Sequence, residues 1–365
     1  MRSSRARAGS GAIVSSAREA AATWPAWVVW GPRAAAAWSV AYAALGLWWT
    51  SGRGEFPFGV GPASGPASSL LHGLPRAMGA PAVAVLGAIG VAVALAVARS
   101  RRAPVTAPTV AFAWAQTLAL LVLVPDARVI ATAAYAPLFL LGAPFGWPPM
   151  SFALALQWEI VNQHLCIVGG VCWGATALTA SRLARGACLA CGRGGGRAGG
   201  ARWTSPAAAR RWGRWAVVAA VLAPLPYAAT RMAWAFGIPL GGDPRVIDAA
   251  RQDAAAFPAA GLALVAIAGA VLTLGLVRPW GEVFPRWLPA LRGCAVPPML
   301  AVAPAGVATV LLLTSAFGLL RSSVGSGTNL DLMTLAWLVW GIALGAATLA
   351  YHLRRRGQCA ACGRR

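Results

Sequence analysis

The sequence contains no lysine, and charged residues of any kind are scarce. Only 11% of the 365 residues are charged and 58% are hydrophobic, whereas charged residues make up roughly a quarter of an ordinary soluble domain. This scarcity excludes a soluble globular protein and indicates an integral membrane protein. All 31 basic residues are arginine, and alanine and glycine are abundant, which we interpret as the codon bias of a GC-rich bacterial genome.

Acidic residues are also few, so that nine of them leave a formal net charge of +22. In a soluble domain this excess would suggest a nucleic-acid partner. Here most arginines lie within a few residues of an apolar segment, where basic side chains anchor the cytoplasmic side of a membrane protein. We therefore expect the lipid bilayer and its anionic headgroups as partners and no nucleic acid, and the sequence leaves a homo-oligomer open.

Several catalytic and targeting signals are missing. The sequence has no His-Glu-x-x-His, no Gly-x-Ser-x-Gly and no phosphate-binding glycine loop, and its three histidines, His72, His164 and His352, fall in three different segments. Residues 1–22 are small, polar and basic, without the apolar core and cleavage site of a signal peptide. We expect them to form a disordered cytoplasmic tail.

Eight apolar segments have about the length that a bilayer core requires. They cover residues 34–50, 77–98, 107–124, 152–180, 215–236, 254–277, 296–320 and 330–349. With both termini in the cytoplasm, 24 of the 31 arginines fall on the inner side, as the positive-inside rule requires. The prediction is an all-α protein of the bacterial inner (cytoplasmic) membrane with about eight transmembrane helices.

A ninth apolar segment, residues 129–147, does not fit this topology. It is interrupted by Pro137, Gly142, Pro144 and Gly146, and as a full span it would place the most arginine-rich loop outside. We interpret it as a re-entrant or interfacial segment on the outer side, where neighbouring protein satisfies its backbone.

The eight segments fall into two similar halves. At an offset of 182 residues, Trp30, Gly31, Pro57, Gly59 and Pro62 match Trp212, Gly213, Pro239, Gly241 and Pro244. Each half ends in Trp-Gly, an apolar run, arginines and Cys-x-x-Cys-Gly-Arg. The sequence predicts a tail (1–22), a first four-helix repeat (23–193), a Gly/Arg-rich linker (194–211) and a second four-helix repeat (212–365). Because each half has an even number of spans, the repeats should be parallel.

The two Cys-x-x-Cys-Gly-Arg sequences, here called knuckles, contain Cys188, Cys191, Cys359 and Cys362. A two-residue gap allows both thiolates to bind one tetrahedral ion, and two such pairs complete a four-cysteine zinc site. The long chain between the pairs requires the fold to bring them together. A redox dithiol and knuckles without any ligand are the alternatives. Cys166, Cys172 and Cys294 are expected to be ordinary cysteines.

Polar groups in two spans form a candidate binding site on the outer side. On a helix, Glu159, Asn162 and Gln163 share one face, and the fifth span carries Tyr227 and Arg231. Glu159 and Arg231 should lie at similar depth, so they could form an ion pair if their helices are neighbours. The alternative is that Glu159 is an interfacial carboxylate and that Arg231 reaches the outer headgroups.

Three classes of function remain open. A permease-like protein for a small or amphiphilic compound explains the duplication and the outer polar residues. A non-catalytic membrane scaffold in which zinc joins the halves explains all of the features with the fewest assumptions. A membrane enzyme acting on thiols, quinones or lipids ranks third, because the knuckles lie in tails and not beside a span, so the protein is more readily interpreted as a non-enzyme.

Overall fold

The computed structural model describes residues 25–59, 69, 71–100, 105–126, 128–146, 157–194, 202–241, 244–245, 247–248, 256–286, 291–325 and 332–364. All named elements within these ranges are helices, which confirms the all-α prediction. The predicted disordered tail lies outside the described residues, as does most of the glycine-rich part of the predicted linker.

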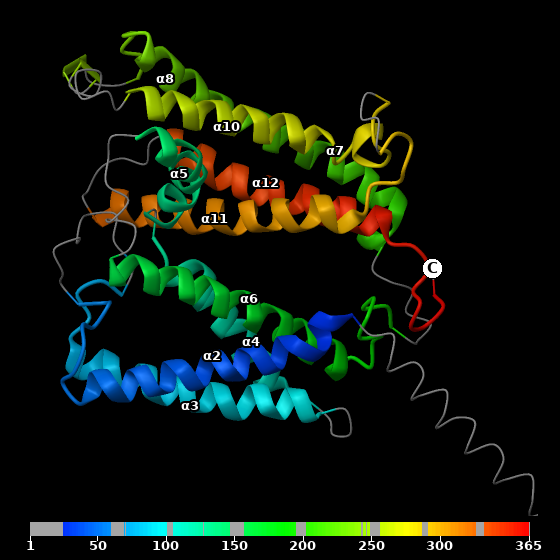
Figure 1. Ribbon diagram of the computed structural model, residues 1–365. Coiled ribbons are helices and arrows are strands. Elements are labelled where there is room, and N and C mark those ends of the chain that lie inside the picture. The colour runs from blue at the N-terminus through cyan, green and yellow to red at the C-terminus, as the bar shows by residue number, and fades with distance from the viewer. Residues whose placement is uncertain are drawn as a thin grey trace, which may run out of the picture.

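The elements of the first half are α2 (Ala26–Thr50), α3 (Arg76–Arg99), α4 (Ala107–Leu118), the π-helix η1 (Ala119–Leu123), α5 (Arg128–Gly142), the 3-10 turn η2 (Ala143–Phe145) and α6 (Trp158–Ala184). Those that follow are η4 (Arg202–Thr204), α7 (Pro206–Leu222), α8 (Leu225–Ala235), α10 (Ala256–Leu274), η5 (Pro279–Gly281), α11 (Pro298–Gly325) and α12 (Leu332–Arg355). Most of them run side by side along the molecule (Figure 1).

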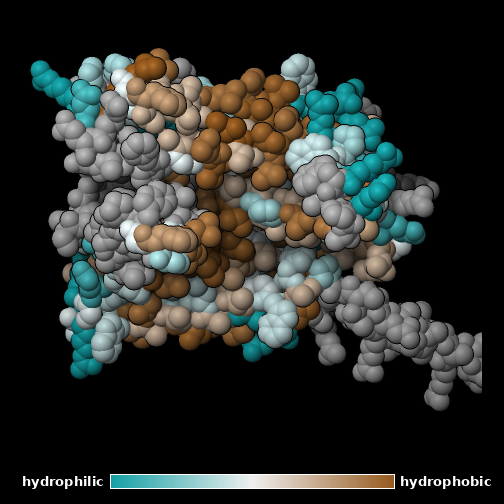
Figure 2. Space-filling view, turned by 45° about the horizontal axis from the view of Figure 1, so that its top comes forward, coloured by the Kyte–Doolittle hydropathy of each residue, from teal (hydrophilic) through white to brown (hydrophobic). Residues whose placement is uncertain are grey.

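Each of the eight predicted spans overlaps a helix, and five helices in the described part of the chain are long and apolar enough to cross a membrane. These are Arg76–Arg99, Trp158–Ala184, Pro206–Ala235, Pro298–Arg321 and Thr334–Arg355. Ala107–Leu123 and Ala260–Leu274 are apolar but shorter. Figure 2 shows apolar side chains across the middle of one face and hydrophilic ones toward the ends, as expected of a protein surrounded by lipid.

Two helix boundaries differ from the prediction for identifiable reasons. Helix α2 begins at Ala26 and continues through Pro32, whereas the predicted span began only at residue 34. Helix α7 begins at Pro206, inside the predicted linker, because Ser205 caps it by accepting a hydrogen bond from the Ala208 amide at 3.2 Å. The fifth predicted span is divided into α7 and α8 at Pro224, which removes a backbone donor from the helix.

The helices of each half pack in the same order. In the first half, α2 packs against α3 and α6, and α4 packs against α6. In the second, α7 and α8 pack against α10, α7 packs against α12, and α11 packs against α12. The first helix of each half therefore contacts the second and the fourth, and the third contacts the fourth.

Matched glycines allow the closest of these approaches. A methyl group added at Gly31 of α2 would lie 2.8 Å from Cβ of Ala175 on α6. One added at Gly213 of α7 would lie 2.6 Å from Cβ of Ala350 on α12. Both distances are well below van der Waals contact, so a side chain at either position would push the two helices apart.

The halves meet where η1 and α5 contact α11. The π-helical turn η1 is a rare departure from the α-helical hydrogen-bond pattern, and side chains of α11 donate to two of its carbonyl groups. The Thr314 hydroxyl donates to the Leu121 carbonyl at 2.5 Å, and the Arg321 guanidinium donates to the Val122 carbonyl at 3.4 Å. Helix α5 lies at the end of the bundle away from the C-terminus (Figure 1), on the side predicted to be outer.

Candidate metal centre

The first knuckle follows directly from the end of α6. The chain leaves the helix through Gly186, which has a φ of +58°, and the Ala187 amide donates back to the Arg182 carbonyl at 2.9 Å, as at many helix C-termini. Cys188 then opens a tight loop. Its amide donates to the Arg193 carbonyl at 3.0 Å, and the Gly192 amide donates to the Cys188 carbonyl at 2.7 Å.

The second knuckle repeats this loop. The Cys359 amide donates to the Arg364 carbonyl at 3.0 Å, and the Gly363 amide donates to the Cys359 carbonyl at 2.7 Å. Gly192 and Gly363 have φ values of +74° and +67°, a left-handed conformation that glycine adopts without steric cost. The glycine after each cysteine pair is therefore required by the turn that carries the two thiols.

The two knuckles face each other and exchange equivalent hydrogen bonds. Arg193 of the first donates to the Arg364 carbonyl at 2.7 Å, and Arg364 of the second donates to the Arg193 carbonyl at 3.4 Å and to the Gly194 carbonyl at 2.6 Å. Arg193 also reaches the Gly357 carbonyl at 3.3 Å. Because the two loops have the same geometry, they form a pseudo-two-fold contact between segments that are 171 residues apart.

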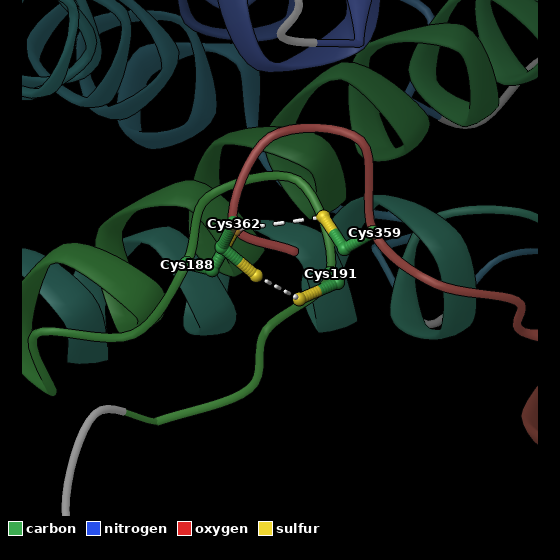
Figure 3. A group of neighbouring side chains, drawn as sticks. All are labelled: Cys188, Cys191, Cys359 and Cys362. Carbon is green, nitrogen blue, oxygen red and sulfur yellow. Dashed lines mark hydrogen bonds between the residues drawn. The ribbon is translucent and has the colours of Figure 1, made fainter. Parts of the chain in front are cut away.

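This contact brings the four sulfur atoms together (Figure 3). The Sγ atoms of Cys188 and Cys359 are 3.9 Å apart, those of Cys191 and Cys362 are 3.6 Å apart, and all four lie within 4.8 Å of one another. Zinc–thiolate bonds of about 2.3 Å in a tetrahedron place sulfurs about 3.8 Å apart. The predicted site is therefore present as a cluster of the right size for one ion, and all four cysteines are half-buried.

The surroundings favour the thiolate form of one of the four cysteines, Cys188. Burial opposes ionisation of Cys188, but the Cys191 and Ala190 amides and neighbouring thiols outweigh it and lower the pKa of Cys188 to about 7. Burial and hydrogen bonds with neighbouring cysteines raise the pKa of Cys191, because a thiol that donates to a thiolate holds its proton. Arg182 donates to the Leu189 carbonyl at 2.5 Å, and Arg356 reaches the Cys191 carbonyl at 3.5 Å. These guanidinium groups offset the negative charge that four thiolates would leave on a divalent ion.

The remaining cysteines do not join the cluster. Cys166 is buried on α6, where its sulfur lies 3.4 Å from the Tyr42 hydroxyl. Cys172 lies one and a half turns further along the same helix, and Cys294 is exposed. No other group of three or more metal-ligating side chains is found in the part of the chain that the structure describes.

The structure does not form the predicted ion pair between Glu159 and Arg231. Glu159 lies 3.5 Å from Arg128, whereas the Arg231 guanidinium lies over the rings of Tyr227 and Trp234, at 5.2 and 4.2 Å from their centres. The prediction failed because it assumed that the fourth and fifth spans are neighbours, and helices of the second half separate them (Figure 1).

Sequence reasoning missed the residues that complete the outer polar cluster. Asp126 is fully buried, pairs with Arg128 at 2.8 Å and accepts a hydrogen bond from the Gln163 amide at 2.8 Å. Arg321, from the second half, donates to the Pro125 carbonyl at 3.2 Å. Asn162 is also buried and accepts from the Tyr42 hydroxyl at 2.8 Å. Asp126 lies three residues beyond the end of η1, in a segment that the sequence could only assign to a loop.

Comparison of the chain with protein-family models, with curated proteins and with solved structures found no match. We therefore infer the function from the sequence and from the geometry of the cysteine cluster.

Proposed function

We propose that this protein is a membrane scaffold of two parallel four-helix halves joined at their cytoplasmic ends by one structural zinc ion. The observation that supports it is the cluster of four sulfurs from two knuckles at separations expected of a tetrahedron. Four protein ligands leave no open coordination position for a substrate or water, which is the property of a structural site.

The tandem arrangement is supported by three independent features of the two halves. Helices pair in the same order, Gly31 and Gly213 occupy matched positions against the last helix of their half, and the knuckles have the same internal hydrogen bonds. The eight-span topology with both ends in the cytoplasm follows from an even number of helices in each half together with the distribution of arginine.

The zinc ion would add binding energy to the contact between the knuckles, which hydrogen bonds from Arg193, Arg356 and Arg364 already join. Zinc-finger peptides gain about 10–16 kcal/mol on binding zinc at neutral pH, and a site closed by ligands from both halves uses part of this energy to hold them in one arrangement. Cys188 and Cys191 hold the ion from the first half, and Cys359 and Cys362 from the second.

The test is to insert a protease site in the linker at residues 195–201, cleave the purified zinc-loaded protein in detergent and measure the temperature at which the halves separate. Chelation should lower that temperature, and Cys191→Ser should lower it equally and reduce bound zinc to near zero. Cys294→Ser, which changes an exposed cysteine outside the cluster, is the control. If the halves separate at the same temperature with and without chelator, zinc does not hold them together and the proposal is contradicted.

A permease-like function is the second candidate, and the outer polar cluster favours it. Asp126, Arg128 and Glu159 lie next to the contact between the halves, where Arg321 arrives from α11. Buried charges at the boundary between two repeats are typical of transport sites. Binding of a small or amphiphilic compound that is weakened by Asp126→Asn but not by Cys191→Ser would favour this function.

A further inference from the structure

The cytoplasmic end of the second half contains a cavity of about 230 Å³. It is lined by Arg210, Arg214, Val277, Arg278, Pro279, Glu282 and Arg354. The lining comes from the start of α7, the turn after α10 and the end of α12. Four of its seven residues are arginines and one is acidic, so the cavity carries a net positive charge of three.

Only one of the four arginines is neutralised by a carboxylate. Arg354 pairs with Glu282 at 3.2 Å and also donates to the Leu276 carbonyl. Arg210, Arg214 and Arg278 have no carboxylate partner among the described residues. Arg210 and Arg214 are four residues apart on α7, where like charges repel each other. An anion bound between them would remove this repulsion.

The equivalent cavity of the first half shows that this charge is not a general property of the cytoplasmic face. That cavity, about 250 Å³, is lined by Val28, Val29, Arg33, Val97, Ala98, Thr179, Leu183 and Leu189. Val28 occupies the position of Arg210 at the offset of the first helices, and Leu183 occupies that of Arg354 at the offset of the knuckles. The same place in the fold is thus mainly apolar in one half and cationic in the other.

The cationic cavity continues into a surface that faces lipid. Arg210, Arg214, Val218 and Leu222 form one row along α7 at intervals of four residues. Val218 and Leu222 are exposed, and so is Trp215 beside them, at 76%. The helix belongs to the apolar stretch Pro206–Ala235, so the arginines lie where headgroups would be and the apolar residues lie where acyl chains would be.

We propose that this cavity binds the headgroup of an anionic phospholipid, with Arg210, Arg214 and Arg278 contacting the phosphate and an acyl chain lying along Val218 and Leu222. Basic cavities between helices at the cytoplasmic face bind such headgroups, and guanidinium groups bind phosphate oxygens in a forked geometry. The proposal uses none of the cysteines and does not depend on the metal centre.

The experiment is native mass spectrometry of the full chain in detergent, titrated with phosphatidylglycerol or phosphatidylcholine. We expect one phosphatidylglycerol to bind in preference to phosphatidylcholine. Each arginine near a charged lipid contributes about fivefold in affinity, so Arg210→Gln with Arg214→Gln should weaken binding about 25-fold. Arg33→Gln, in the equivalent cavity of the first half, should leave it unchanged.

The melting temperature shows whether each variant is folded, and Arg278→Gln, on the turn after α10, provides a second test if the double variant is not. An excess of inorganic phosphate should not displace the lipid. Equal binding of the two lipids, full binding by the double variant, or displacement by free phosphate would each overturn the proposal.

Discussion

The buried charges around Asp126, at the end of the molecule predicted to be outer, provide a quantitative test of the structure. The Asp126 carboxylate is fully buried, 2.8 Å from Arg128 and 2.8 Å from the Gln163 amide. Arg128→Gln would leave that carboxylate without its cation, which typically costs about 3–5 kcal/mol. Asp126→Asn should cost less, about 1–3 kcal/mol, because the Arg128 side chain is 25% exposed and keeps Glu159 as a partner.

The double variant decides whether these two residues act as a pair. With both charges removed, no unpaired charge remains in the interior, so the cost should fall short of the sum of the single variants by about 1–3 kcal/mol. The assay is thermal and denaturant unfolding in detergent. The control is the cycle of Glu159→Gln and Arg231→Gln, which should be additive because these side chains have different partners. Additive effects at Asp126 and Arg128 would refute the buried pair.

Three further predictions concern packing, topology and thiol chemistry. Gly213→Ala should destabilise the protein by about 1–3 kcal/mol, because the added methyl group would push α7 away from Ala350 on α12. Gly306→Ala is the control and should not destabilise it, because nothing lies within 4 Å of a methyl group added there on α11. Equal effects of the two changes on the melting temperature would contradict the close packing. Reporter fusions after Arg197 and after the last residue should both report cytoplasm, and a reporter found outside at either place would overturn the parallel halves. In metal-free protein, alkylation of Cys188 followed by mass spectrometry should accelerate as the pH rises through about 7, because its pKa is lowered to about 7; acceleration only above a pH of about 8.5, the range of an ordinary thiol, would show that the amides do not stabilise its thiolate.

The cysteine cluster could be predicted from the sequence because each pair of ligands lies within a short motif of six residues. Each knuckle contains two thiols at the spacing of a metal ligand pair and a glycine for the turn, and the repetition of the Cys-x-x-Cys-Gly-Arg pattern indicated that the two belong together. The structure adds the arginines that link the loops. Arg193 and Arg364 could not be assigned this role beforehand, because their acceptors are backbone carbonyls of the opposite knuckle.

The apolar helices could also be predicted, since their length and composition alone identify them. The neighbours of each helix could not. Hydropathy gives the depth of Glu159 and Arg231 but not their distance from each other within the plane of the membrane, and the pair proposed from equal depth is not formed. The burial and pairing of Asp126 could not be predicted for a related reason. Its contacts with Arg128 and Gln163 form only because the end of η1 packs beside α6.

The most direct test of the metal centre is X-ray absorption at the zinc edge on protein purified without added metal, together with the zinc content per chain. We expect one zinc per chain with four sulfur neighbours at about 2.3 Å. A shell containing nitrogen or oxygen, two zinc ions per chain, or protein that remains free of metal when zinc is supplied would contradict a closed four-cysteine site.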